Sequence, residues 1–180
     1  MTLTVDENGK PFYNVSVDDS LLIENSAMGF TAANGIILSE GFQVKNTTFS
    51  SEDETWTQPW GENKKNRNHY NEMAVSLTNE DQVQLTLRFR VFDDGIGFRY
   101  EYTVPTVDSL LITDELTTFR FHRDGTSWSI PASAETYELL YQQQPISEVE
   151  TANTPFTFKT ADGVYGSCLL YTSDAADEAR

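Results

Sequence analysis

A strict alternation of apolar and polar residues in Val83–Val91 constrains the fold of this chain most. Every second residue of this run is apolar, and the residues between are polar or charged. A period of two is typical of an antiparallel strand with one buried and one solvated face. The alternation resumes in Ile96–Tyr102, where Arg99 and Glu101 occupy the polar face. Because Asp94-Gly95 separates the two runs, we predict a β-hairpin here.

Similar short runs recur along the chain and predict further strands. They cover residues 3–5, 13–17, 35–38, 42–44, 73–77, 117–121 and 156–158. No window carries apolar residues at helical spacing for more than about two turns. Many short strands separated by turn residues predict an all-β fold, namely an antiparallel β-sandwich with little helix.

Charge and hydropathy exclude several classes of partner. The formal net charge of the 180 residues is −16, which argues against nucleic acid, because binding to its backbone requires clustered Lys and Arg. No apolar run approaches the length of a membrane span, so we expect no membrane partner. Met1 leads directly into strand-like sequence, and we recognise no signal peptide.

Cysteine and histidine are too scarce for several kinds of site. The single cysteine is Cys168, and the two histidines are His69 and His122. This composition argues against a disulfide framework, a zinc–thiolate site and a cysteine nucleophile. The two histidines are also too far apart in sequence to indicate a His-rich metal site.

The stretch of twenty residues from Asp53 to Glu72 has the composition of a binding site. It holds two tryptophans, several carboxylates, an imidazole and several amides. Pro59 and Gly61 lie in its middle and favour a sharp turn of the backbone. We therefore predict a functional loop that packs rings and still presents polar groups.

Individual residues of this stretch allow more than one role. Trp56 and Trp60 are candidates for stacking against sugar rings, or for filling the core or wedging the sandwich against a following domain. Arg67, Asn68 and His69 carry donors suited to sugar hydroxyls or to a domain interface. The candidate substrate-binding or domain-interface residues are Trp56, Trp60, Arg67, Asn68, His69 and Glu72.

The same stretch resembles the DETWxPxWGE…RNHYNE signature of the N-terminal domain of glycoside hydrolase family 97, the bacterial α-glucosidases and α-galactosidases. Residues 89–101 resemble the FRxxxDGxxFRYE hairpin of that family, and residues 128–141 resemble its next block. Residues 153–155 and 159–165 resemble the segment before the inter-domain chain. These blocks follow one another in the family's order between residues 2 and 167.

The resemblance implies a mutarotase-like β-super-sandwich that precedes a catalytic (β/α)8 barrel. Glycoside hydrolysis needs two carboxylates, and in the family these lie on the barrel. We see no βαβ alternation, so we expect the barrel to be absent, the sandwich to be incomplete and the chain to carry no catalytic residue.

We assign residues 1–167 to the truncated N-terminal domain. Residues 168–180 resemble the translated read-through of a sequencing adapter, and we expect them to be a non-native tail, with a natural small-residue tail as the alternative.

The resemblance also implies a calcium ion shared with the barrel. A glutamate of the N-terminal domain helps to hold that ion in the family, and the matching block places it at Glu138, with Glu135 as the alternative register. Calcium takes roughly six to eight oxygen ligands, so one carboxylate cannot make the site alone. Without the resemblance, Glu138 reads as an ordinary solvated glutamate.

The resemblance predicts the N-terminal domain of a calcium-dependent exo-α-glycosidase, with an α-linked oligosaccharide as substrate and a periplasmic or secreted location. It does not distinguish a glucoside from a galactoside substrate, or an inverting from a retaining mechanism. Two alternatives remain. A free-standing carbohydrate-binding module would use Trp56 and Trp60 as a platform, and a mutarotase-like epimerase would need His and Glu side chains on one concave sheet.

Overall fold

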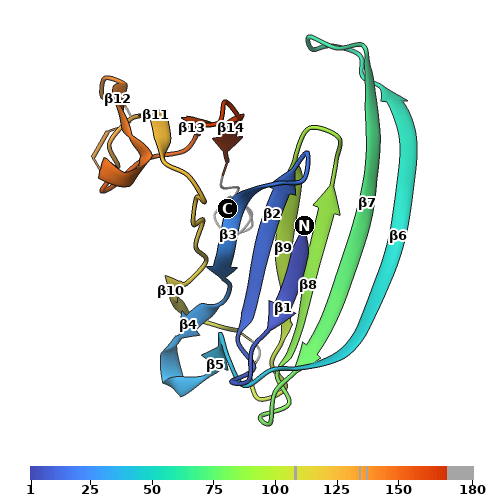
Figure 1. Cartoon of the computed structure of the whole chain (residues 1–180). Helices are drawn as coiled ribbons and strands as arrows, with labels where there is room; N and C mark the ends of the chain where they lie inside the picture. Colours follow the sequence, from blue (N-terminus) through green and yellow to red (C-terminus); the bar gives the residue numbers. More distant parts are fainter. Residues whose placement is uncertain (108, 134, 137, 170–180) are drawn as a thin grey trace. The chain divides into compact units, whose positions relative to one another are not determined.

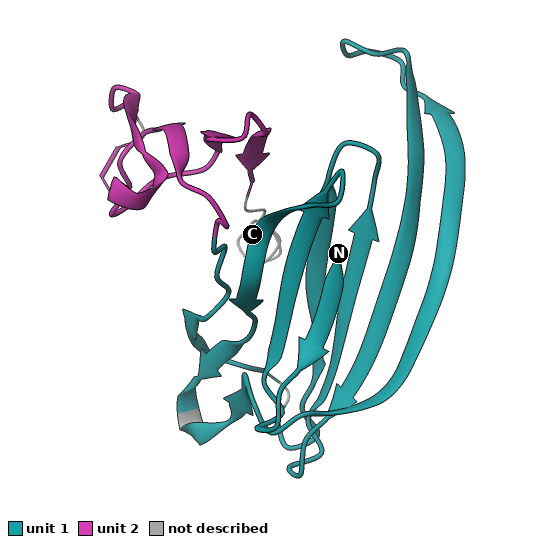
Figure 2. Cartoon of the chain, in the orientation of Figure 1, with its two compact units in different colours: residues 1–120 teal, residues 121–180 magenta. Residues whose placement is uncertain are grey.

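The computed structural model describes residues 1–107, 109–133, 135–136 and 138–169. The chain forms two compact units, residues 1–120 and residues 121–180 (Figure 2). Nearly all of the regular structure is antiparallel β, which confirms the all-β prediction. Within the described residues, no helix is long and apolar enough to cross a membrane.

Two antiparallel sheets make up most of the first unit (Figure 1). The three-stranded sheet has the order β1-β2-β3, with bounds Thr2–Val5, Pro11–Val17 and Ser20–Ala27. The four-stranded sheet has the order β6-β7-β8-β9, with bounds Gln43–Thr57, Lys65–Thr78, Gln84–Val91 and Ile96–Thr103. The predicted hairpin is confirmed as β8 and β9, paired from Gln84↔Thr103 to Val91↔Ile96.

Smaller elements complete both units. In the first unit, a sheet of order β10-β4-β5 comprises Ile112–Glu115, Phe30–Ala32 and Ile37–Leu38, and a 3-10 helix spans Ala33–Gly35. In the second unit, a sheet of order β12-β11-β13-β14 comprises Gln142–Pro145, Gly125–Ser129, Phe156–Thr160 and Tyr165–Cys168. A second 3-10 helix spans Ile146–Glu148.

The core of the first unit lies between its two main sheets. Leu85, Leu87 and Phe89 of β8 are fully buried, as their alternation predicts. Tyr13 of β2 meets them from the opposite sheet, with its ring centroid 6.4 Å from that of Phe89 and 5.4 Å from that of Phe98. Side chains from two facing sheets therefore interdigitate, which is the packing of a β-sandwich.

Two half-buried tyrosines connect the main sheet to the smaller elements. The backbone N–H of Gly29 donates to Tyr100 Oη at 3.2 Å, and Tyr102 Oη donates to the carbonyl oxygen of Leu38 at 2.5 Å. Burial raises the pKa of Tyr100 to about 12 and raises that of Tyr102 as well. Both hydroxyls therefore stay protonated and keep their hydrogen bonds over the ordinary pH range.

The prediction of a strand at residues 117–121 is wrong in detail. The segment runs beside β3, where Thr118 N donates to the carbonyl oxygen of Ala27 at 3.0 Å. Arg120 N, two residues further along the segment, does not bind a backbone carbonyl of β3. It donates to the side-chain Oγ of Ser26 at 2.9 Å. A hydroxyl that replaces a backbone carbonyl interrupts the regular ladder, so the segment runs beside β3 without being a regular strand.

The stretch from Asp53 to Glu72 is not the loop that its composition predicted. Its first part belongs to β6, a strand of 15 residues, and its last part to β7, a strand of 14 residues. Only residues 58–64 form a loop, at the tip of the long ribbon that the two strands build (Figure 1). Every residue of β6 is exposed, so neither of its faces selects apolar residues, and the period of two is missing.

The boundary between residues 167 and 168 stays a prediction. Cys168 is the last residue of β14 and lies opposite Phe156 of β13. The rest of the predicted tail beyond Leu169 lies outside the described residues.

Candidate functional site

The β6–β7 ribbon carries the sequence motif, and its two faces differ. We call the face of the four-stranded sheet that bears Leu87 and Phe89 the inner face, and the face that bears Arg88 and Glu101 the outer face. Directly paired residues of an antiparallel ladder share a face, and consecutive residues of a strand alternate between faces. The register of the ribbon therefore assigns each of its side chains to one face.

This register separates the predicted site residues. The outer face carries Trp56 opposite Asn66, Asn68 opposite Glu54, and Glu72 opposite Ser50. The inner face carries Arg67 opposite Thr55, and His69 opposite Asp53. Trp60 lies in the tip loop, outside both strands. The six predicted residues are thus close in the chain, but they do not form one cluster.

On the inner face, the side chains of Arg67 and Asp53 form an ion pair. Arg67 donates from Nε to Asp53 Oδ1 at 2.7 Å and from Nη2 to Asp53 Oδ2 at 2.6 Å. This bidentate pair lowers the pKa of Asp53 and raises that of Arg67. His69 Nδ1 lies 3.8 Å from Asp93 Oδ2 and makes no hydrogen bond within the described residues.

On the outer face, polar groups and an indole remain accessible. Asn68 Nδ2 donates to Glu54 Oε1 at 3.0 Å, and both residues stay at the surface. The indole of Trp56 is 49% exposed. Tyr70 differs, because the guanidinium carbon of Arg90 lies 4.3 Å from its ring centroid and the ring of Phe92 lies 5.5 Å away. One aromatic face of Tyr70 is therefore already occupied.

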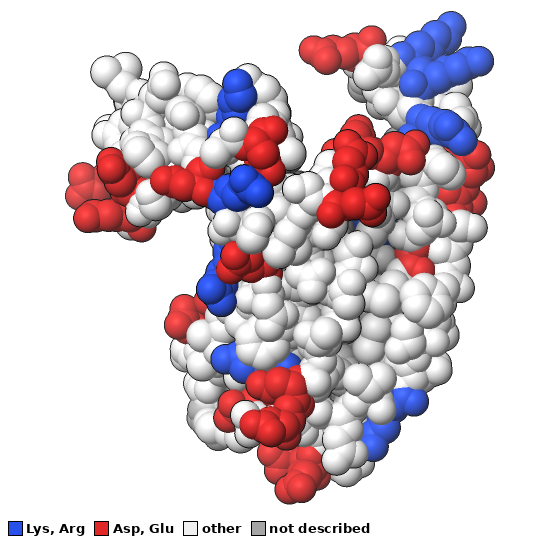
Figure 3. All heavy atoms as spheres, viewed as in Figure 1, with Lys and Arg blue, Asp and Glu red and all other residues white. Residues whose placement is uncertain are grey.

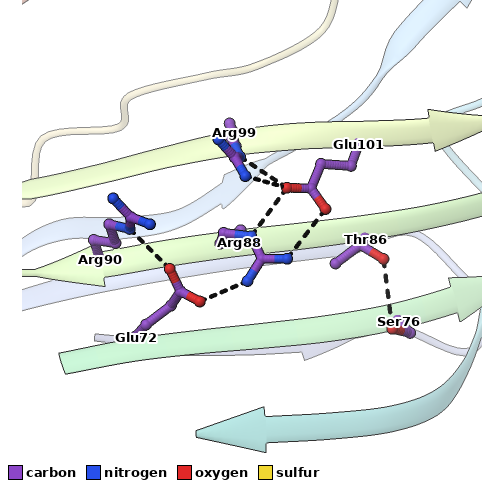
Figure 4. A network of polar contacts seen from close by, with 7 residues as sticks. All are labelled: Glu72, Ser76, Thr86, Arg88, Arg90, Arg99 and Glu101. Carbon is purple, nitrogen blue, oxygen red and sulfur yellow. Dashed lines mark hydrogen bonds and ion pairs between the residues drawn. The ribbon is translucent and has the colours of Figure 1, made fainter. Parts of the chain in front are cut away.

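Glu72 belongs to a network of ion pairs across β7, β8 and β9 (Figure 4). Its carboxylate accepts from Arg88 Nη1 at 2.5 Å and from Arg90 Nε at 2.8 Å. Arg88 also donates from Nε to Glu101 Oε1 at 2.9 Å, and Arg99 Nε donates to the same oxygen at 2.8 Å.

The ion pairs in this network shift the pKa values of Glu72, Arg88 and Glu101. The hydrogen bond from Arg90 lowers the pKa of Glu72, and that from Arg88 lowers the pKa of Glu101. The two carboxylates raise the pKa of Arg88. Glu72 is thus held by two arginines of the same sheet, and its predicted role in substrate binding or at a domain interface stays a prediction.

The tip of the ribbon forms a shallow hollow. The hollow measures about 490 Å³ and is lined by Thr57, Gln58, Pro59, Trp60, Gly61 and Lys64. Trp60 is 85% exposed, and basic side chains gather at this tip in Figure 3. Since both Trp56 and Trp60 are exposed, the alternative that they fill the core is wrong. Stacking on a sugar and wedging against another domain both stay open.

Glu138 lies in the second unit, in a segment without regular structure. It is exposed, and its backbone N–H donates to Thr136 Oγ1 at 3.0 Å. The alternative ligand, Glu135, is also exposed, and its N–H donates to Ser133 Oγ at 3.2 Å. Among the described residues, no group of three or more His, Cys, Asp or Glu side chains could hold a metal ion. The calcium ligand predicted at Glu138 therefore stays a prediction.

Several residues of this surface escaped the sequence analysis. Asp53 and Glu54 are partners of Arg67 and Asn68, fourteen positions away in the chain. The signal that could have found them is the hairpin register around the Pro59–Gly61 turn, which places carboxylates opposite donors. Arg88 and Arg90 were recognised only as polar positions of an alternating strand.

Comparisons with known proteins identify relatives of the chain. The sequence model of a family described as "Glycosyl-hydrolase 97 N-terminal" matches residues 1–170. A retaining alpha-galactosidase of Bacteroides thetaiotaomicron is 26% identical over 88 residues, which are 49% of this chain and 13% of that protein.

Solved structures agree with this relationship. A glycoside hydrolase family 97 enzyme from Pseudoalteromonas sp. strain K8, solved in complex with panose and with acarbose, superposes with a TM-score of 0.82 and 34% sequence identity. A β-arabinopyranosidase superposes with a TM-score of 0.78 at 23% identity, which shows similarity of fold alone. The chain covers 26% of the first structure and 28% of the second, and each match includes 91% of this chain.

Proposed function

The chain belongs to glycoside hydrolase family 97 as its N-terminal domain, and from this we propose that it is part of a calcium-dependent exo-α-glycosidase. The parent enzyme is an α-glucosidase or α-galactosidase that acts on α-linked oligosaccharides in carbohydrate metabolism. The β-sandwich contributes to the domain interface, the carbohydrate pocket and the calcium site. The catalytic carboxylates lie on a barrel that does not occur among the described residues.

One observation carries the proposed role in binding. The ribbon that holds the family motif is exposed along all of β6, and its indoles and polar side chains fill no core. The part of this strand pair that holds the motif, Asp53–Thr57 and Lys65–Glu72, has no buried residue and therefore contributes little hydrophobic stabilisation. Its residues therefore serve contacts beyond this sandwich, with a sugar or with the rest of the enzyme.

The segment around Glu138 supports a role at the domain interface. Leu139, Leu140 and Tyr141 follow it directly, and all three side chains are exposed, Leu140 almost completely. Contiguous exposed apolar groups mark interaction surfaces more often than ordinary solvated surface. We assign this surface to contact with the barrel of the same polypeptide, and Glu138 to the calcium ion held at that contact. The parent enzyme is periplasmic or secreted.

The experiment that tests this function uses the parent enzyme. Its calcium is removed with a chelator, and hydrolysis of aryl α-glucosides and aryl α-galactosides is followed while calcium is added back. We expect one of the two substrates to be hydrolysed and the rate to rise with calcium. A rate that changes with neither chelator nor calcium would contradict the calcium dependence. If the parent enzyme hydrolyses neither substrate, the α-glycosidase assignment is wrong.

The exposure of Trp56 and Trp60 also favours a second candidate function, a carbohydrate-binding module. Such a module would leave the activity of any attached enzyme largely independent of its own residues. The calcium titration above, repeated with Glu138→Gln, separates the two functions, because only the proposed function makes activity depend on this residue.

A further inference from the structure

We propose that the outer face of the β6–β7 ribbon, at Trp56, Glu54 and Asn68, is the part of this domain that contacts a sugar ring. The inference rests on the proposed function and assigns the carbohydrate contact to one of two faces. Neither Glu54 nor this division was evident from the sequence. The rest of the ribbon, including Arg67 and His69, then serves other contacts.

Trp56 supplies the apolar part of the surface. Its indole is about half exposed, and the ladder places it on the same face as Asn66. An exposed indole offers a flat apolar surface with an N–H at its edge. A pyranose ring presents C–H groups on its faces and hydroxyls at its rim, so it can stack on the indole while its hydroxyls project sideways.

Glu54 and Asn68 lie where such hydroxyls would reach. They form the neighbouring same-face pair, two residues along each strand from Trp56 and Asn66. This offset corresponds to about 6.6–6.8 Å along the ribbon. Only one hydrogen bond joins the pair, from Asn68 Nδ2 to Glu54 Oε1. The second carboxylate oxygen, the second amide N–H and the amide oxygen can therefore accept from and donate to vicinal hydroxyls.

The other aromatic and charged groups of the ribbon are less suited to this role. Arg67 uses two donors on the carboxylate of Asp53, so a sugar would have to displace a charge-assisted pair. The ring of Tyr70 is covered by Arg90. Phe49 is 76% exposed but lies on the inner face, opposite Met73, with no carboxylate–amide pair beside it. Phe49 therefore provides a matched control.

The test uses the chain of residues 1–180 and two sugars, maltotriose and melibiose, which carry terminal α-glucosyl and α-galactosyl groups. Binding is followed by NMR through the indole N–H signals of the three tryptophans. We expect one sugar to shift the Trp56 signal. Trp56→Ala should weaken binding at least about tenfold, and Glu54→Gln and Asn68→Ala should weaken it less. Phe49→Ala should bind as the unchanged chain does, and circular dichroism confirms that each variant is folded.

Three results would overturn the inference. The first is unchanged affinity in Trp56→Ala. The second is loss of binding in Trp60→Ala alone, which would place the sugar in the tip hollow. The third is that the unchanged chain binds neither sugar. None of them bears on hydrolysis by the parent enzyme. The calcium titration of the parent can succeed while this binding test fails, so the two proposals fail separately.

Discussion

Glu72→Ala is expected to lower the free energy of unfolding by about 2–3 kcal/mol, because hydrogen bonds to charged groups contribute more than neutral ones. The side chain of Glu72 is only 11% exposed and accepts from both Arg88 and Arg90. Its removal leaves the two guanidinium groups beside each other without the carboxylate between them. Urea unfolding of the chain measures the change as a lower transition midpoint.

Glu101→Ala is the matched control for this prediction. Glu101 lies in the same network and also accepts from two arginines, but its side chain is 36% exposed. Solvent screens its pairs, so its loss should cost under about 1 kcal/mol. Equal losses for the two variants would mean that burial does not set the strength of this network.

Acid should weaken the same network. Arg90 lowers the pKa of Glu72, and Arg88 lowers that of Glu101. A carboxylate with a lowered pKa in the folded state contributes stability above its ordinary pKa, here 4.5, and loses it as the pH falls through the folded value. At pH values below 4.5, we expect the urea midpoint of unfolding of the unchanged chain to decrease as the pH is lowered. The midpoint of Glu72→Ala should decrease less steeply over the same range.

Glu138→Gln in the parent enzyme should raise the calcium concentration needed for half-maximal activity by at least about tenfold. Substitutions at residues that only support a metal's ligands already cost about 10–100-fold in affinity, and the amide keeps the shape of the ligand but loses its charge. Because Glu138 is exposed and its side chain makes no hydrogen bond among the described residues, the melting of the sandwich should not change.

Glu135→Gln tests the register of the same assignment. Both glutamates lie in one exposed segment and have similar local backbone contacts, so a general effect of lost surface charge should appear in both. A shift in calcium dependence for Glu135→Gln alone would move the ligand three residues earlier. If neither variant changes the calcium dependence, this domain does not contribute a ligand to the calcium site.

The sequence predicts the fold where one face of a strand is buried. The β8–β9 hairpin follows from its alternation, because burial of Leu85, Leu87 and Phe89 forces polar residues such as Arg88 to the other face. The stretch from Asp53 to Glu72, which is part of the β6–β7 ribbon, was interpreted as a loop, since a strand exposed on both faces, such as β6, has no need for alternation. Its backbone hydrogen bonds alone define it, and these leave little signal in composition.

The sequence indicates which stretch of the chain is a candidate site, and this role stays a prediction, but it does not indicate how the side chains are arranged. The stretch containing Trp56 and Asn68 was recognised by composition, and both lie at the surface. Which face each side chain occupies depends on the register of β6 against β7, and a shift of one residue would reverse every assignment. Glu138 could be singled out only through the family resemblance, because an exposed glutamate in an irregular segment has no pattern of its own.

Because we propose that this domain is a non-catalytic part of an α-glycosidase, the decisive measurement is hydrolysis by the chain alone. The purified chain of residues 1–180 is incubated with aryl α-glucosides and aryl α-galactosides, with and without calcium, beside the parent enzyme at equal molar concentration. We expect turnover by the parent and none by the chain above an enzyme-free blank. Calcium-dependent turnover by the chain alone would contradict this proposal.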